Sequence, residues 1–279
     1  MKNILVATDL SARSDRALHR ALNLAREFQA KLTILCVIDE DNPKNIHQQL
    51  SVLAKKQIMA VIDENLDGVD YKIEIVTGIP HIQILTTSLK TKADLVILGL
   101  HRHHNHNNSV MGAVLSRVVK ESLKPILVVK ELPKFEYKKI LVATDFNSHS
   151  KNSLKLALQL FPKAGFTMLH SYYMPILASS KNLEDEHKDN CQADMERILK
   201  EAISELHKAD KKATSPKYKI TQKLEKGAVL DVLNNEIVKA KPQLLVIGSF
   251  ARTGITRALS LNVAEEFLLN PPCDILVAH

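Results

Sequence analysis

Residues 4–9, Ile4-Leu-Val-Ala-Thr-Asp9, decide the fold of this chain, and residues 140–145 repeat them letter for letter. Each copy is a continuous apolar run that ends in a carboxylate, which is typical of a strand buried on both faces of a parallel sheet. A polar turn and a helical pattern follow each copy. Because open α/β sheets bind ligands at the carboxyl ends of their strands, Asp9 and Asp145 are the first candidate ligand contacts.

The chain around these two stretches alternates apolar runs with helical patterns. In the first copy, further strands are predicted near residues 31–38, 71–76, 94–98 and 126–129. Strands separated by helices must run parallel. The sequence therefore predicts an α/β fold with two tandem doubly wound domains, each a five-stranded parallel sheet flanked by helices.

The repeat also sets the domain boundaries, which we place at residues 1–131 and 136–279 with a short linker between them. The offset between the copies is 136 at Ile4 and Ile140, and it is 149 at Gly99 and Gly248. The second copy thus carries 13 additional residues, since 149 − 136 = 13. We expect them between the second strand and the long helix, around residues 172–189.

Composition narrows the class of protein. The net charge is +7, but Lys and Arg are scattered among 31 acidic residues, which favours a mixed solvated surface over nucleic-acid binding. No apolar run reaches the length of a membrane-spanning helix, and the N-terminus enters a strand directly, without the pattern of a signal peptide. Three widely spaced cysteines indicate buried thiols in a reducing compartment. We therefore expect a cytoplasmic protein.

Further motifs accompany the repeated stretch: Gly78-Ile-Pro80, Asp-Leu-Val-Ile-Leu-Gly at 94–99, and the tail from Gly248-Ser-Phe-Ala-Arg-Thr-Gly254 through Val263-Ala-Glu265 to Cys273-Asp-Ile-Leu-Val277. With them, nearly the whole chain resembles the universal stress protein family in its tandem two-domain form. The resemblance implies that the domains pair through their last strands about a pseudo-two-fold axis. Such pairing would also cover two apolar sheet edges, so a monomer and a dimer of tandems both stay open.

Many members of this family bind ATP through a signature of Gly, two residues, Gly, nine residues, then Gly followed by Ser, Thr or Asn. Glycines let the backbone approach phosphates, and the N–H groups at a helix start favour anions. Neither copy keeps the signature whole. The positions read Gly99, Arg102, Gly112 and Ala113 in the first domain, and Gly248, Ala251, Leu261 and Asn262 in the second.

The resemblance therefore implies weak or absent binding of ATP, ADP or AMP, with Mg only as a companion of the nucleotide. It gives Asp9 and Asp145 a contact on the adenine or ribose side, and it adds Val37 to the nucleotide-binding positions. Arg102 either fills the phosphate space with its own cation or grips a phosphate as a bidentate donor. The alternative for Asp9 and Asp145 is structural, because a carboxylate at a strand–helix turn can satisfy free amides.

A His-rich polar loop is expected after Gly99. Its imidazoles are weak candidates for Zn, Ni or Cu ligands, because all of them are local and no Cys, Asp or Glu joins them. Adventitious metal binding and a pH-responsive anion site beside Arg102 are the alternatives. The four histidines are His101, His103, His104 and His106.

The leading hypothesis is a non-catalytic stress-response regulator or protective factor that acts through protein partners. Two alternatives stay open: an ATP-binding protein with slow ATP hydrolysis, and a small-molecule carrier that uses the cleft between the domains. The sequence contains no Gly-x-Ser-x-Gly elbow, no GxGxxG and no GxxxxGK[ST] phosphate loop, so it offers no known catalytic motif of these kinds.

Overall fold

The computed structural model describes residues 1–63, 66–100, 102–105, 108–133, 136–173, 181–209, 217–248 and 263–278, with backbone alone at 102–105, 108–111, 181 and 209. The chain forms two compact units. Unit 1 comprises Met1–Phe135 together with the returning segment Leu268–Asp274, and unit 2 comprises Glu136–Phe267 and Ile275–His279.

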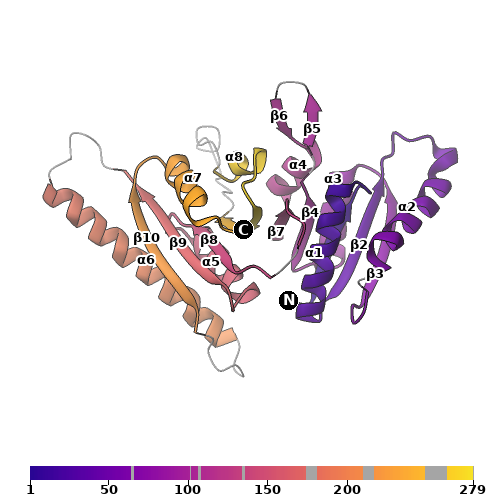
Figure 1. Ribbon diagram of the computed structural model, residues 1–279. Coiled ribbons are helices and arrows are strands. Elements are labelled where there is room, and N and C mark those ends of the chain that lie inside the picture. The colour runs from indigo at the N-terminus through magenta and orange to yellow at the C-terminus, as the bar shows by residue number, and fades with distance from the viewer. Residues whose placement is uncertain are drawn as a thin grey trace. The chain divides into compact units, whose positions relative to one another are not determined.

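Unit 1 contains the predicted parallel sheet, with the strand order β7-β4-β1-β2-β3. Helices α1 and α2 pack on one face of the sheet, and α3 and α4 pack against each other on the opposite face (Figure 1). The strands are β1 (Asn3–Thr8), β2 (Lys31–Ile38), β3 (Tyr71–Thr77), β4 (Leu95–Gly99) and β7 (Ile126–Val129). The helices are α1 (Ala12–Phe28), η1 (Lys44–Ile46), α2 (His47–Ile62), α3 (Pro80–Lys90) and α4 (Ala113–Glu121).

Unit 2 repeats the design, with the strand order β12-β11-β8-β9-β10 and parallel pairing of β8 with both β9 and β11. Helices α5 and α6 pack against each other, and α7 contacts β9. The strands are β8 (Lys139–Ala143), β9 (Gly165–Tyr172), β10 (Lys219–Lys226), β11 (Leu244–Gly248) and β12 (Asp274–Ala278). The helices are α5 (Ser148–Leu160), α6 (Lys181–Ala209), α7 (Val229–Ala240) and α8 (Val263–Leu269). The predicted α/β fold is confirmed in both halves, while the pairing of the last strands stays a prediction.

The order of strands reverses beside the first strand of each unit. In unit 1 the chain runs outward through β1, β2 and β3 and then returns to place β4 on the other side of β1. Unit 2 makes the same reversal between β8 and β11. Such a reversal leaves a crevice at the carboxyl ends of the two central strands, where the adjacent connections turn to opposite faces of the sheet.

The turn after the first strand is built identically in both units. The hydroxyls of Thr8 and Ser14 lie 2.8 Å apart in unit 1, and Thr144 donates to Ser150 over 3.1 Å in unit 2. The residue between strand and helix has a positive φ of 64° at Leu10 and again at Phe146. This left-handed conformation is costly for a side-chain-bearing residue, so the surrounding hydrogen bonds must hold it in place.

The two aspartates take part in this turn. Asp9 accepts a hydrogen bond from the amide of Ser11 at 3.0 Å, and Asp145 accepts one from the amide of Asn147 at 3.2 Å. Ser11 and Asn147 in turn are the N-caps of α1 and α5. The structural interpretation of the carboxylates, that they satisfy amides at the strand–helix turn, is thus confirmed in both halves.

A buried carboxylate joins the returning segment to the rest of unit 1. Asp274 is 1% exposed and accepts hydrogen bonds from the amides of Lys130 and Glu131 at 2.8 and 3.0 Å. Its other oxygen lies 3.6 Å from the guanidinium of Arg20 on α1, which is also buried. A buried charge is tolerated when it is paired and hydrogen-bonded in this way. Helix α1 is therefore tied to the end of β7 by a residue from the far end of the chain.

Two expectations need correction. The stretch after Gly99 is not a loop throughout, because β5 (Arg102–Asn105) pairs with β6 (Asn108–Met111) as an antiparallel hairpin. Antiparallel strands need only a short connection, so eight residues suffice for a hairpin even though six of them are polar. The count of 13 additional residues is the sum of a deletion and a larger insertion in the second copy. The register pairs Leu35 with Ala7 and Leu169 with Ala143, an offset of 134, so the second copy is shorter before β9 and longer after it.

The longer connection corresponds to α6, which has 29 residues against 16 in α2. Lys151 and Lys155 on α5 bridge to Glu201 and Glu205 on α6 over 2.7–3.2 Å. These contacts lower the pKa of Glu205 to about 2, mainly through its hydrogen bond with Lys155.

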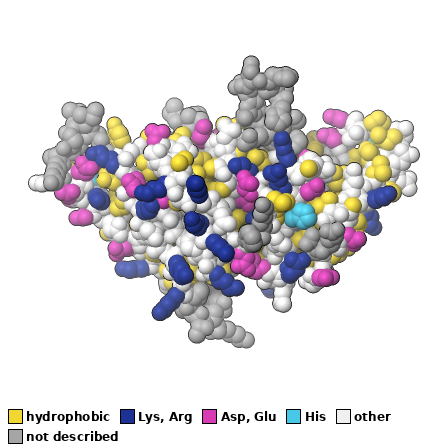
Figure 2. All heavy atoms as spheres, in the orientation of Figure 1, with side chains coloured by type: hydrophobic (Ala, Val, Ile, Leu, Met, Phe, Trp, Pro, Cys, Tyr) yellow, Lys and Arg dark blue, Asp and Glu magenta, His cyan; other side chains and the backbone are white. Residues whose placement is uncertain are grey.

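On the face in Figure 2, Lys and Arg side chains intermingle with Asp and Glu, as expected for a mixed surface. Among the described residues, no helix is long and apolar enough to cross a membrane.

Candidate functional site

A cavity of about 240 Å³ lies at the carboxyl ends of β1 and β4, at the point where the strand order of unit 1 reverses. We call it the unit 1 cavity. Its polar side comes from the strand–helix turn and the first turn of α1, with Asp9, Ser11, Arg13 and Ser14. Its apolar walls come from β2, α3 and α4. They include Val37, Pro80, Ile84, Leu98, Leu100, Val114 and Leu115.

The start of α4 forms part of this wall. Gly112 is its N-cap and Ala113 its first residue, and both line the cavity. The helix has no side-chain cap and no acidic residue in its first turn. The N-cap Gly112 has no side chain to accept from the first amide N–H groups, and a helix start of this kind favours an anion.

The thiol beside this cavity is chemically inert near neutral pH. Cys36 on β2 is buried, and burial together with the charge of Asp9 raises its pKa to about 11. A nucleophilic or metal-binding cysteine needs the thiolate, which is a minor form at such a pKa. Cys191 and Cys273 are buried as well.

Gly99 has a packing role that the sequence did not reveal. A Cβ atom there would lie 2.9 Å from the Cα of Ser14 and 3.0 Å from the carbonyl oxygen of Arg13. At Gly248 it would lie 3.0 Å from the backbone nitrogen of Ser150. In both units the glycine lets the first turn of a helix approach the neighbouring strand, which brings helix and strand residues together around one cavity.

The matching site in unit 2, the unit 2 cavity, measures about 90 Å³. It lies at the ends of β8 and β11 and again includes the aspartate, the Thr–Ser pair and the glycine of the repeat. Three positions differ in chemistry, with His149 in place of Arg13, Ser171 in place of Val37 and Val229 in place of Pro80. Its lining comprises Ala143, Thr144, Asp145, Asn147, His149, Ser150, Leu169, His170, Ser171, Val229, Leu233, Ile247, Gly248 and Val263.

His170, which matches Cys36 of unit 1, occupies a fixed position in this cavity. Its Nδ1 lies 2.8 Å from the carbonyl oxygen of Thr144, and its ring stacks on Phe146 with centroids 4.0 Å apart. Burial lowers the pKa of His170, although the Thr144 carbonyl and the charge of Asp145 act in the opposite direction. The neutral imidazole is therefore favoured in the folded protein.

The structure brings together five of the residues selected from the sequence. Asp9, Val37, Gly99, Gly112 and Ala113 all line the unit 1 cavity. In unit 2, Asp145 and Gly248 line the cavity, whereas Ala251 and Asn262 lie outside the described residues.

The histidine-rich stretch contributes no described side chain. Arg102, His103 and His104 belong to β5, where only the backbone is described, and His101 and His106 lie outside the described residues. Among the residues that the structure describes, no group of three or more His, Cys, Asp or Glu is placed to hold a metal ion.

The sequence reading missed Arg13 in unit 1 and His149 and His170 in unit 2. A signal for the first two was present, because each lies four residues after the aspartate of the repeated stretch, within the first turn of the following helix. Comparing the two copies position by position would have shown an arginine exchanged for a histidine beside a shared carboxylate.

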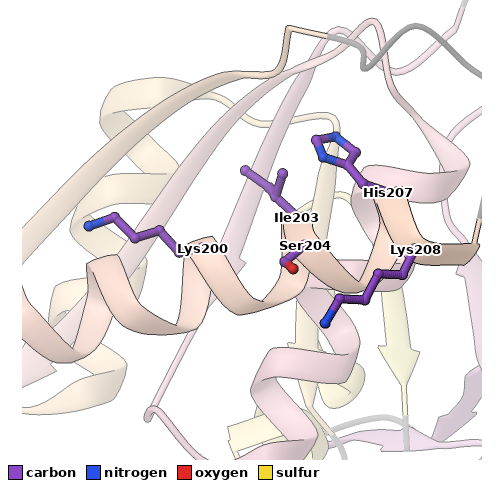
Figure 3. A pocket seen from close by; sticks show the side chains of 5 residues that line it. All are labelled: Lys200, Ile203, Ser204, His207 and Lys208. Carbon is purple, nitrogen blue, oxygen red and sulfur yellow. The ribbon is translucent and has the colours of Figure 1, made fainter.

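A third depression, of about 430 Å³, runs along α6. It is lined by Lys200, Ile203, Ser204, His207 and Lys208, all from this one helix. Figure 3 shows that Ile203 and His207 point to one side of the helix, while Ser204 and Lys208 point to the other. Side chains that diverge in this way do not converge on a ligand, so the depression is an open helix surface.

The model of the universal stress protein family matches residues 1–130 and again residues 136–279. The chain belongs to the universal stress protein family. Two matches in tandem agree with the two α/β units and with the duplicated cavity at their first strands. The expectation drawn from the repeated hexapeptide and the accompanying motifs is therefore confirmed.

Individual relatives agree with the tandem form. The chain is 23% identical to Universal stress protein E of Salmonella typhi over 303 aligned positions, which cover 99% of this chain and 93% of the relative. It is 31% identical to Universal stress protein MJ0531 of Methanocaldococcus jannaschii over 147 residues, 48% of this chain and 85% of the relative. A solved universal stress protein from Archaeoglobus fulgidus DSM 4304 shares the fold, with a TM-score of 0.73 at 17% identity, covering 99% of this chain and 97% of that one.

Proposed function

We propose that this universal stress protein is a non-catalytic regulator that binds an adenine nucleotide weakly, through unit 1 alone, and acts on protein partners. The observation that carries the proposal is the unit 1 cavity, which joins a carboxylate, apolar walls and an uncapped helix start at one place. Asp9 and Val37 supply contacts for the sugar and base, and the amides of α4 supply a place for phosphate.

Unit 2 is a poor nucleotide site by the same criteria. Its cavity is less than half as large. The helix that corresponds to α4 is α8, and its first turn carries Glu265 and Glu266. Carboxylates at a helix start already satisfy its partial positive charge and repel a phosphate.

The charge of the lining favours the less charged nucleotides in unit 1. Arg13 is the cation among the described lining residues, and Asp9 adds a negative charge to the same wall. At the position of the signature hydroxyl, Ala113 offers a methyl group. We therefore expect AMP and ADP to bind at least as tightly as ATP, with no appreciable hydrolysis.

The test is a titration of the full chain with AMP, ADP and ATP, followed by thermal stability. A nucleotide at about 100 times its Kd stabilises the folded state by about 2.7 kcal/mol. Asp9→Ala and Asp145→Ala form a matched pair, because both aspartates make the same contact in the same turn. We expect Asp9→Ala to abolish the stabilisation and Asp145→Ala to keep it.

Two results would overturn the proposal. One is the absence of stabilisation by any of the three nucleotides at millimolar concentration. The other is loss of binding in Asp145→Ala with retention in Asp9→Ala. Release of phosphate from ATP that depends on Asp9 would instead favour the slow ATPase.

A further inference from the structure

The unit 2 cavity has a chemistry of its own, which appears when each polar group is assigned its hydrogens. Thr144 Oγ1 donates to Ser150 Oγ, and Ser150 Oγ donates to the carbonyl of Asn147. Ser171 Oγ donates to the carbonyl of Gly227 at 2.6 Å. The hydroxyl hydrogens in the lining are therefore committed to the protein, and what these groups retain is lone-pair capacity.

His170 adds an acceptor. A carbonyl oxygen only accepts hydrogen bonds, so the contact of 2.8 Å between Nδ1 and Thr144 places the hydrogen on Nδ1. In the neutral ring, Nε2 then carries a lone pair. Because stacking on Phe146 fixes the plane of the ring, this lone pair has a fixed direction.

His149 supplies an independent observation. Its Nδ1 is shielded from solvent and has no hydrogen-bond partner among the described residues. Buried polar atoms are nearly always satisfied by protein, water or ligand, so an orphan beside a cavity points to a missing partner. His149 lines the unit 2 cavity, where a ligand would supply such a partner.

Charge decides which partner suits the lining. Asp145 is exposed and brings a carboxylate to the lining of the cavity. Helix α8, which contributes Val263 to the lining, carries Glu265 and Glu266 in its first turn. The surroundings thus offer acceptors and negative charge, which favour a cation with N–H donors over any anion.

We propose that the unit 2 cavity is a binding site for a small alkylammonium ion, whose N–H groups donate to His170, His149 and the Asp145 carboxylate. A primary ammonium group provides three donors and one positive charge. The volume of about 90 Å³ is several times the roughly 10–15 Å³ that one water molecule needs in a cavity, and so admits a ligand of a few heavy atoms. The site is independent of nucleotide binding in unit 1.

Protonation should control this site. The titratable groups around His170 are Asp145 and His149 in the cavity, and His187 and Asp194 on α6. Protonated imidazole has no lone pair at Nε2 and repels a cation, so acid weakens binding. The loss of binding should therefore follow the protonation of His170.

The experiment is a titration of the full chain with methylammonium chloride at constant ionic strength, followed through the imidazole C–H resonances by NMR. We expect a saturable shift of the His170 and His149 signals at about pH 7.5 that weakens as the pH falls below the ordinary imidazole pKa of about 6.5. Tetramethylammonium has the same charge without N–H donors and should produce no saturable shift. Acetate, an anion of similar size, should produce none either.

Two variants make the test specific. His170→Cys introduces the residue that unit 1 carries as Cys36, and it should weaken binding at least about tenfold, which corresponds to about 1.4 kcal/mol. Asp145→Asn keeps an acceptor for the turn but removes the charge, and should also weaken binding. This variant tests the proposal independently if His170→Cys fails to fold. Equal shifts with tetramethylammonium, saturation by acetate, or unchanged binding in Asp145→Asn would each overturn the proposal.

Discussion

The cavities of unit 1 and unit 2 lie at the same point of the same fold, yet they differ in size and in chemistry. Both contain the aspartate of the repeated stretch, a Thr–Ser hydroxyl pair and a glycine that admits the helix. Arg13 and Val37 of unit 1 are matched by His149 and Ser171 of unit 2. The strand–helix turn and the glycine that create the crevice are thus duplicated, while the side chains that would contact a ligand differ between the units.

This difference separates scaffold residues from ligand residues. Asp9 and Asp145 hold the strand–helix turn in both units, so their presence alone does not predict a nucleotide. The two cavities are distinguished by Arg13 and His149, which follow the aspartates, and by the first turns of α4 and α8. The uncapped start of α4 and the acidic start of α8 are the sharpest contrast.

The largest expected effect is a loss of stability in unit 1 alone. Asp274→Ala removes the acceptor of two amides and leaves buried Arg20 without this carboxylate. Breaking a buried ion pair from one side costs about 3–5 kcal/mol. We expect unit 1 to lose this much stability in chemical denaturation, with hydrogen exchange of β1 and β4 accelerated before that of β8 and β9.

The control for this variant is Asp94→Ala. Asp94 also accepts two backbone amides, those of Lys2 and Asn3, but it is exposed. Its loss should cost much less, because water can replace it. Equal costs for the two variants would show that burial of Asp274 does not matter.

A smaller effect tests what the two units share. Gly99→Ala and Gly248→Ala each force a Cβ against backbone atoms of the neighbouring helix turn, which must shift. Overpacking of this kind costs about 1–3 kcal/mol. Both variants should lose comparable stability in urea denaturation.

Gly165→Ala is the matched control, because a Cβ there meets only the carbonyl of Lys138 at 3.5 Å, an ordinary contact. A loss at Gly165 as large as the losses at Gly99 and Gly248 would contradict the packing role of the two repeat glycines.

The smallest expected effect is a pH dependence of stability in unit 2, where His170 replaces Cys36 of unit 1. Because burial lowers the pKa of His170, the unfolded state takes up a proton at a higher pH than the folded state. The stability that His170 contributes is present above its unfolded pKa of about 6.5 and is lost as the pH falls through the lower folded value. Hydrogen exchange of β8 and β9 should accelerate in this window, and His170→Cys should remove that part of the acceleration. An unchanged pH dependence in His170→Cys would assign it to other groups.

The repeat made most of the fold predictable. Buried parallel strands are continuously apolar, so the central strands were read directly from residues 4–9 and 94–98 and their copies. The hairpin of β5 and β6 was missed, since six of its eight strand residues are polar and polar and apolar residues do not alternate along it. The net count of 13 residues likewise concealed two opposite changes, since α5 is shorter than α1 and α6 is longer than α2. Two offsets, measured at Ile4 and at Gly99, give only the sum of the changes between them.

The sequence by itself determined the family, the duplicated strand, and the five positions that meet in the unit 1 cavity. The duplicated strand is a local pattern that repeats within the chain, and the five positions follow from the family resemblance. Only the tertiary structure decided which residues join them: Arg13 and Ile84 in unit 1, and His149 beside His170 in unit 2. Such neighbours come from different helices and strands, and their proximity depends on packing that no local pattern records. The repeated Ile-Leu-Val-Ala-Thr-Asp therefore specifies where a ligand can bind, and the packed elements around it specify which one.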